Sequence, residues 1–404
     1  MDLLVLAVFG VVYLGMVVGR LPGLALDRTG VALLGAMALV VAGRIEMPRV
    51  WDAVDTPTMA LLFALMVVSS QFRMGGFYSE VVRRIGAMNV SPPMLLAILV
   101  GVSGVLSALL ANDIVCLAMA PMLVEACARR RLDPIPFLLA LACSANVGSA
   151  ATLIGNPQNM LIGQVMHLSF AGYLAAASVP SVLGLFLTWA VIVRLHRFRW
   201  EKETVLSAAS QAPAFDRWES SKGGAVLLVL VVAFLFAPVP RELVAMAGAG
   251  LLLCSRKMRS REFLALVDWQ LLVLFVALFV VNRVMVTSGN LERMMGGIAG
   301  TGLDVSHPAW LFGLTVVLSN LVSNVPAVML LLPSAAGDSA GYLLALASTL
   351  AGNLFIVGSI ANIIVVDQAE RMGVRIGWST HARVGVPVTL LTLAVTALWL
   401  ALVY

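Results

Sequence analysis

Charged residues are scarce in this sequence, and their scarcity excludes most water-soluble folds. Only 12% of the 404 residues are Asp, Glu, Lys or Arg, and 61% are hydrophobic. A soluble domain carries about 25% charged residues, so this chain has too little polar surface to cover a globule in water. The composition therefore predicts a membrane protein. Its net charge of +5 is interpreted through membrane topology rather than nucleic-acid binding.

The motifs of metal and nucleotide chemistry are also missing. No group of His, Cys, Asp or Glu has the spacing of a metal site, and no glycine-rich phosphate loop is present. The sequence therefore predicts no enzyme, no cofactor and no ATP-driven step. Cysteines are few and lie in or beside apolar runs, where we expect inert packing residues; they are Cys116, Cys127, Cys143 and Cys254. The first apolar run lacks the pattern of a cleaved signal and is predicted to be a retained helix.

Apolar stretches close to the length of a membrane span make up most of the chain. Those predicted to cross are at about 2–19, 29–43, 56–74, 135–165, 170–195, 222–237, 241–254, 268–287, 341–366 and 379–403. Two further stretches, about 94–127 and 307–336, carry Asn-containing breaks at their centres. Lipid tolerates such breaks only where protein or a cavity surrounds them. We interpret both stretches as re-entrant hairpins that enter the membrane and return to the same side.

The two halves of the chain resemble each other. VDTPTMALLFALMVV at 54–68 resembles VDWQLLVLFVALFVV at 267–281, and LIGNPQN at 153–159 matches IVGSIAN at 356–362. The recurring residues that carry most weight are Asp55/Asp268, Asn112/Asn324, Pro121/Pro333, Gly155/Gly358 and Asn159/Asn362. The predicted fold is all-α and polytopic, with repeats at 1–199 and 222–404 and a polar cytoplasmic linker at 200–221. Each repeat has five spanning helices and one hairpin, and this odd number inverts the second repeat, as in many secondary transporters.

The positive charges support this topology. Lys and Arg concentrate in segments 20–28, 73–93, 129–131, 194–222, 255–267 and 367–383, which the topology places in the cytoplasm. The exceptions among all 26 are Arg44, Arg49, Arg241, Arg283 and Arg293. The Lys and Arg residues fall on the cytoplasmic side in this way only if the two hairpins do not cross the membrane. This topology predicts a multi-pass protein of a bacterial-type inner membrane with both termini in the periplasm.

A binding site is predicted where four interruptions of apolar helices meet near the bilayer midplane. Interrupted helices free backbone carbonyls that, with Asn and Ser oxygens, can coordinate a cation, and the N-terminus of a resumed half-helix attracts an anion. The candidate ligands are Asn112, Asp113, Asn146, Thr152, Gly155, Asn156, Asn159, Ser323, Asn324, Gly358, Ser359 and Asn362. The alternative is that these residues form packing kinks and interhelical hydrogen bonds.

Asp113 is the candidate proton carrier. It lies at a predicted hairpin tip between apolar runs, where a carboxylate is costly unless it is paired or protonated. The alternative is an N-cap on the second arm of the hairpin. Asp55 and Asp268 each begin a helix and are expected to be N-caps, and Asp367 is expected to meet solvent. Arg283 is expected to reach the periplasmic interface, and the alternative is that it faces an anion cavity.

At these motifs the sequence resembles the ion transporter superfamily, which groups divalent-anion/sodium symporters, citrate-type permeases, arsenite efflux permeases, one class of sodium/proton antiporters and the melanosomal P protein. SANVGSAATLIGNPQNMLIG at 144–163 is similar to the broken-helix motif of the citrate and P-protein branches, and SNVPAVMLLLP at 323–333 is similar to their second hairpin. LLANDIVCLAMAP at 109–121 is similar to the first hairpin of the arsenite permeases.

The resemblance implies scaffold and transport domains, an elevator motion and a homodimer. It also implies one sodium site at Asn112 and Gly155–Asn159, and a second at Ser323, Asn324 and Gly358–Asn362. The tips here read Ala-Asn-Asp at 111–113 and Ser-Asn-Val at 323–325, where the sodium/dicarboxylate symporters carry Ser-Asn-Thr. This departure favours coupling to protons through Asp113.

The sequence thus predicts a secondary transporter of a small anion or oxyacid, coupled to protons or sodium, that works in a lipid bilayer without ATP or nucleic acid. Three alternatives remain. Arsenite or antimonite efflux is favoured by the Ala-Asn-Asp tip, and sodium/proton antiport needs buried carboxylates. A channel is disfavoured by the internal repeat, because channels use rings of residues in an oligomeric pore.

Overall fold

The computed structural model describes residues 2–19, 25–197, 200–202, 213–299, 307–335, 337 and 339–404, which are helical apart from turns, loops and isolated bridges such as that between Leu132 and Glu201. The helices of the first half are α1 (Leu3–Val18), α2 (Arg28–Val41), α3 (Met47–Ala53), α4 (Thr56–Met74), α5 (Phe77–Ala87), α6 (Pro92–Leu109), α7 (Asn112–Arg129), α8 (Pro134–Ser149), α9 (Pro157–Val165) and α10 (Phe170–Leu195).

The second half follows with α11 (Arg217–Phe236), α12 (Arg241–Leu253), α13 (Ser260–Ala265), α14 (Trp269–Thr287), α15 (Asn290–Ala299), α16 (Pro308–Val322), α17 (Asn324–Leu331), η1 (Leu332–Ser334), α18 (Ala340–Ala351), η2 (Ile356–Gly358), α19 (Ile360–Arg371) and α20 (Trp378–Val403). Long and short helices recur in the same order as in the first half. Within the described ranges, α4, α6, α10, α11, α14 and α20 are long and apolar enough to cross a membrane.

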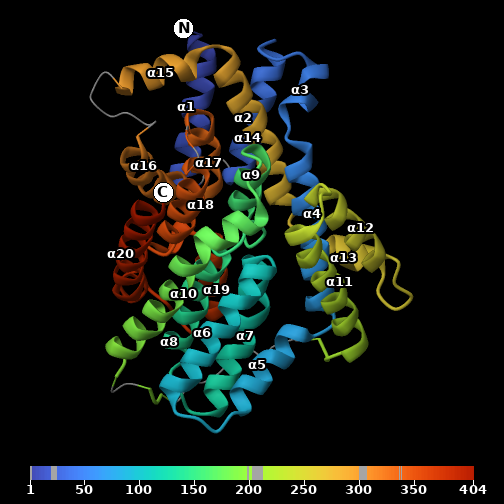
Figure 1. Cartoon of the computed structure of the whole chain (residues 1–404), viewed down its shortest axis with the longest axis vertical. Helices are drawn as coiled ribbons and strands as arrows, with labels where there is room; N and C mark the ends of the chain where they lie inside the picture. The colour runs from blue at the N-terminus through green and yellow to red at the C-terminus, as the bar shows by residue number, and fades with distance from the viewer. Residues whose placement is uncertain are drawn as a thin grey trace.

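The halves pack by exchanging equivalent helices. α2 packs against α14, and its counterpart α12 packs against α4. α10 packs in the same way along its counterpart α20. Figure 1 shows α1, α2 and α14 grouped at one end, with α5, α6, α7 and α8 at the other. The core therefore contains residues from both halves.

Short amphipathic helices were not predicted from the sequence. α5 and α15 come directly after α4 and α14, at equivalent places in the two halves. α5 carries Glu80, Arg83 and Arg84 beside the buried Tyr78 and Val82. Because neither helix has an apolar run near the spanning length, a search for spans passes over both.

The predicted linker at 200–221 is shorter than expected, because α11 begins at Arg217. The Asp216 carboxylate accepts hydrogen bonds from the backbone amides of Trp218 (2.9 Å) and Glu219 (3.1 Å). An N-cap of this kind satisfies amides that the first helical turn leaves free, so the helix starts within the polar segment. Residues 203–212 of the predicted linker lie outside the described residues.

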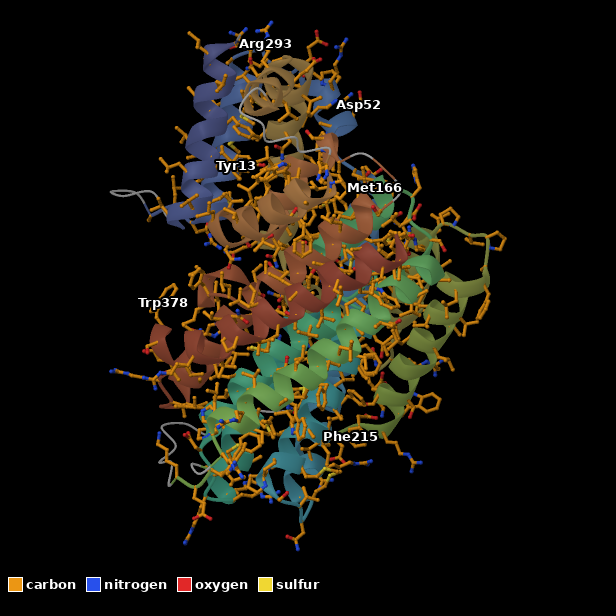
Figure 2. All side chains as sticks on the ribbon, turned by 60° about the vertical axis from the view of Figure 1, so that its left-hand side comes forward. Tyr13, Asp52, Met166, Phe215, Arg293 and Trp378 are labelled. Atoms are coloured by element: carbon orange, nitrogen blue, oxygen red, sulfur yellow. The ribbon has the colours of Figure 1, made fainter. Side chains whose placement is uncertain are left out.

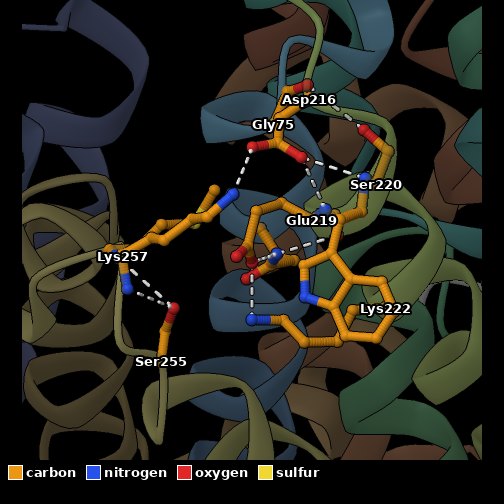
Figure 3. Close-up of polar contacts among 10 residues, drawn as sticks. Gly75, Asp216, Glu219, Ser220, Lys222, Ser255 and Lys257 are labelled. Carbon is orange, nitrogen blue, oxygen red and sulfur yellow. Dashed lines mark hydrogen bonds and ion pairs between the residues drawn. The ribbon is translucent and has the colours of Figure 1, made fainter.

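The start of α11 is fixed to the end of α4 by a polar cluster, drawn in Figure 3. The Asp216 amide donates to the Gly75 carbonyl at 2.9 Å. The buried Glu219 carboxylate accepts from Gln71 at 2.9 Å and pairs with Lys222. The start of α1 is held in an equivalent way, since the Asp2 amide donates to Asn290 of α15 at 3.2 Å. Each half is therefore anchored to the other near the end of its fourth helix, α4 or α14.

Candidate functional site

The four predicted interruptions come together in the structure, and Asn146 of α8 joins three of them. Its side-chain oxygen accepts from Asn112 at the tip between α6 and α7 (3.4 Å) and from Ser359 of the second break (2.8 Å). Its side-chain nitrogen donates to Asn353 at 2.8 Å and to Asn362 at 3.1 Å. All five residues are buried. This network connects residues from both halves at the centre of the predicted site.

The second tip, Asn324, joins the network from the other side. In the orientation that satisfies its surroundings, the Asn324 amide donates to the carbonyls of Gly358 (3.2 Å) and Ser348 (3.0 Å) and accepts from Gln158 at 3.3 Å. Ser323, beside it, has a positive φ of 77° and makes no side-chain capping bond. The second tip is therefore fixed through Asn324, whereas Ser323 supplies the backbone turn.

The break between α8 and α9 is held by amide side chains. Asn156 caps α9, accepting from the Asn159 amide at 2.9 Å. Asn159 donates to the Thr152 carbonyl and the Tyr173 hydroxyl, both at 3.1 Å. The Thr152 hydroxyl bonds the Ala108 carbonyl of α6. These contacts hold the start of α9 against the first hairpin.

Two glycines sit where no side chain fits. A Cβ on Gly155 would lie 2.4 Å from the Ser149 carbonyl oxygen and 2.8 Å from that of Ser107. On Gly358 it would lie 2.8 Å from the side-chain oxygen of Asn320 and 3.0 Å from the Gly352 carbonyl oxygen. The Gly155 carbonyl also accepts the backbone amide of Asn112 at 3.4 Å. The glycines thus let each break approach its neighbouring hairpin.

Oxygen atoms without a partner lie beside both glycines. In the first half they are the Ser107 hydroxyl and the Asn112 side-chain oxygen, and in the second half the Ser319 hydroxyl and the Asn320 side-chain oxygen. Buried polar atoms are normally hydrogen-bonded, so two unpaired oxygens in each half are unusual, and Ser107 and Ser319 occupy equivalent places in the repeat. Oxygen donors of this kind are suited to a small cation or a protonated ligand.

Asp113 lines a cavity of about 250 Å³ beside the first tip. The cavity wall also includes Arg73 of α4, Asp268, and Asn156 and Pro157 at the start of α9. Asp113 lies in the first turn of α7, whose N-cap is Ala111 and has no side-chain capping bond. The alternative of an N-cap role for Asp113 is therefore wrong, and its carboxylate borders a space next to the candidate site.

A second cavity, of about 470 Å³, occupies the equivalent place in the other half and is lined by Asp55, Asn282 and Arg283. Asp55 and Asp268 are N-caps as predicted, accepting from the amides of Thr58 (2.8 Å) and Leu271 (2.9 Å). Arg283 of α14 is part of this cavity wall, which agrees with the alternative of a cavity position for it.

Sequence reasoning missed several residues of the network. Thr349 lies in α18 and Asn353 in the turn that follows it, both outside the segments that the repeat aligned. Thr349 accepts from Asn156 and from Gln158, both at 3.2 Å. Tyr173 donates to the Ala150 carbonyl at 2.9 Å. The available signal was the same as for Asn146, a polar residue within an apolar run.

The comparison with known families decides the class of protein. A family model described as a citrate transporter matches residues 4–343. The chain belongs to the citrate transporter family. This family is part of the ion transporter superfamily, so the resemblance seen in the sequence is confirmed.

Similar proteins support the assignment of this chain as a polytopic membrane transporter. The 46 kDa membrane protein of Mycobacterium leprae is 29% identical over 94% of both chains. Silicon efflux transporter LSI3 of rice (Oryza sativa subsp. japonica) is 29% identical, over 96% of this chain and 95% of its own. The crystal structure of the YdaH transporter of Alcanivorax borkumensis superposes with a TM-score of 0.62 at 15% identity, over 99% of this chain and 97% of that one. The last comparison shows a shared fold.

Proposed function

We propose that this transporter moves a small oxyacid across the inner membrane of a bacterial-type cell, coupled to protons through Asp113. The observation that carries the proposal is the position of Asp113 on the wall of the cavity of about 250 Å³, next to Asn112 and to the start of α9. Ligand cavities for drug-sized molecules measure about 300–1,000 Å³, so this one suits a smaller molecule.

The charges around the cavity support an oxyacid of low charge. Arg73 is the cation on the described wall, and Asp113 and Asp268 are the carboxylates. A multiply charged anion would face two carboxylates, which repel it. A proton on Asp113 would remove one of those charges and supply a hydrogen-bond donor, while the N-terminus of α9 favours an oxygen with partial negative charge. The name of the rice relative, a silicon efflux transporter, also supports an oxyacid.

Sodium is the second candidate coupling ion. The unpaired oxygens of Ser107 and Asn112 in the first half, and of Ser319 and Asn320 in the second, favour it. The proposed sodium positions remain those beside Asn112/Gly155 and Asn324/Gly358. Arsenite or antimonite efflux and sodium/proton antiport stay as alternatives, because each uses the same carboxylate and the same tips.

Uptake into proteoliposomes tests the proposal. Purified protein is reconstituted, a pH gradient and then a sodium gradient are imposed, and dicarboxylates, inorganic oxyanions and arsenite are screened. We expect a small oxyacid to accumulate with the pH gradient alone. Accumulation that strictly requires a sodium gradient would mean that sodium, and not the proton, is the coupling ion. Accumulation of dicarboxylates alone would contradict the proposal that the substrate is a small oxyacid.

Asn112→Ala and Asn324→Ala are expected to abolish this uptake while expression stays near normal, because each removes an amide that fixes one tip. Uptake and membrane expression are measured together, with the exposed Asn89→Ala as the matched control. Full uptake activity of both variants would contradict the assignment of Asn112 and Asn324 to the binding site.

We further propose that transport proceeds by an elevator motion between two inverted repeats in a homodimer, with both termini in the periplasm. A contact that such a motion would break supports this mechanism. Arg241 at the start of α12 donates to the Gly163 carbonyl of α9 at 2.7 Å, and Gln164 of α9 donates to Glu242 at 3.0 Å. α12 packs against α4, whereas α9 begins at one of the breaks that form the candidate site.

The equivalent contact in the other half is not formed. Arg28 begins α2 as Arg241 begins α12, and the seventh and eighth residues of α19, Val366 and Asp367, correspond to those of α9 that are contacted. Among the described residues no ion pair joins Arg28, and Asp367 pairs with Arg371 at 2.9 Å. In inverted repeats the two halves exchange conformations, so the contact of Arg28 would form in the other state.

Arg241→Gln is therefore expected to depopulate the present conformation, and Arg28→Gln to populate it further. The measurement is the distance distribution between spin labels on α12 and at the end of α9. The labelled protein also carries Cys254→Ser, because Cys254 is exposed and would react with the label. Arg256→Gln, on an exposed loop, serves as the control. If Arg241→Gln and Arg28→Gln shift the distance distribution in the same direction, the proposed exchange of conformations between the two halves is contradicted.

A further inference from the structure

A third cavity, of about 740 Å³, lies between α5, α6 and the start of α11 and has no lining residue in common with the cavity of Asp113. One part of its wall carries the side chains of Arg84 and Arg217. Another part is apolar and includes Leu106, Leu109 and Leu110, at the end of α6. None of the described residues that line it is acidic. The cavity therefore combines a cationic region with a hydrocarbon-like wall.

The two arginines are available to an anionic ligand. Arg217 is exposed, and in the described part of the chain no ion pair involves it. Arg84 donates to Glu80 through Nε at 2.7 Å, which leaves its terminal nitrogens for another acceptor. Hydrogen bonds from Arg83 and Arg84 lower the pKa of Glu80, which lies outside the cavity lining, to about 2, so Glu80 stays ionised near neutral pH. Guanidinium groups match the geometry of phosphate oxygens.

The position of the cavity relative to the membrane fits a lipid. Arg84 and Arg217 belong to segments that the charge distribution places in the cytoplasm. Phe215 and Trp218, beside the arginines, are exposed aromatic residues, as is common at the membrane interface. Figure 2 shows Phe215 at the opposite end of the molecule from Asp52 and Arg293. The apolar wall leads from this level towards Leu110, two residues before Asn112.

We infer that this cavity binds an anionic phospholipid, with the phosphate on Arg84 and Arg217 and an acyl chain along the leucines of α6. Basic pockets between helices on the cytoplasmic side are suited to such headgroups. Free phosphate would use the arginines but not the apolar wall. A bound lipid would contact the hairpin beside the candidate site, which links the composition of the membrane to the position of that hairpin.

Lipid binding to the delipidated, full-length protein tests the inference, with native mass spectrometry as the measurement. The ligands are phosphatidylglycerol, phosphatidylcholine with the same acyl chains, and inorganic phosphate. We expect phosphatidylglycerol to bind about tenfold more tightly than phosphatidylcholine, and phosphate alone not to compete with it. The readout is independent of transport, so failure of the proposed function would leave it unaffected.

Two variants make the test specific to this cavity. Arg84→Gln with Arg217→Gln is expected to remove the preference for phosphatidylglycerol. Gly224→Phe fills the cavity without changing its charge, because a Cβ at Gly224 meets no atom within 4 Å, and it is expected to reduce binding of both lipids.

The matched control is Arg256→Gln with Arg261→Gln, which removes the same charge from two exposed positions before and within α13 and should leave the preference intact. Equal binding of the two lipids to the unaltered protein would overturn the inference. Competition by inorganic phosphate, or unchanged binding to the Gly224→Phe variant, would overturn it as well.

Discussion

Asp113→Asn is expected to uncouple transport from the pH gradient. The substitution keeps the size and most of the polarity of the side chain but removes the group that binds and releases a proton. Accumulation against a gradient should fall to the level of protein-free liposomes, whereas exchange of labelled for unlabelled substrate should continue. Exchange needs binding and the conformational change but no net proton movement.

The two assays are run on the same proteoliposomes, with and without a pH gradient. Glu370→Gln is the control, since Glu370 is exposed and does not line the cavity of Asp113. If the Asp113→Asn protein accumulates substrate with the unaltered pH dependence, the proton travels by another group and the assignment of Asp113 is wrong.

Gly155→Ala is expected to destabilise the protein strongly and to abolish transport. The new methyl group would lie 2.4 Å from the Ser149 carbonyl oxygen and 2.6 Å from the Ser149 Cα. Backbone atoms cannot move aside as a flexible side chain can, so the break between α8 and α9 would have to shift. Overpacking of this kind costs about 3 kcal/mol of folding free energy.

Thermal unfolding in detergent, followed by intrinsic fluorescence, measures this loss. The matched control is Gly101→Ala in α6, where a Cβ meets no atom within 4 Å and alanine is the better helix former. Its unfolding temperature should be unchanged or slightly higher. Equal stability of the two variants would mean that the break has room for a side chain, and the close approach at Gly155 would be refuted.

The sequence by itself determined the features that depend on local patterns. Scarce charge and long apolar runs indicated a membrane protein, because lipid excludes charge. The N-caps Asp55 and Asp268 were predictable because a cap contacts an amide only three residues away. The positions of the breaks were predictable for a similar reason, since Asn, Gly and Pro interrupt an apolar helix wherever they occur.

The tertiary structure alone decided which of these features meet. Asn146 contacts Asn353 and Asn362, more than 200 residues away, and nothing in the local sequence of either segment specifies the other as its partner. Asp113 borders a cavity with Arg73 and Asp268 for the same reason. Such contacts depend on how whole helices pack across the two halves, and helix packing depends on the shapes of many side chains together, which no single motif records.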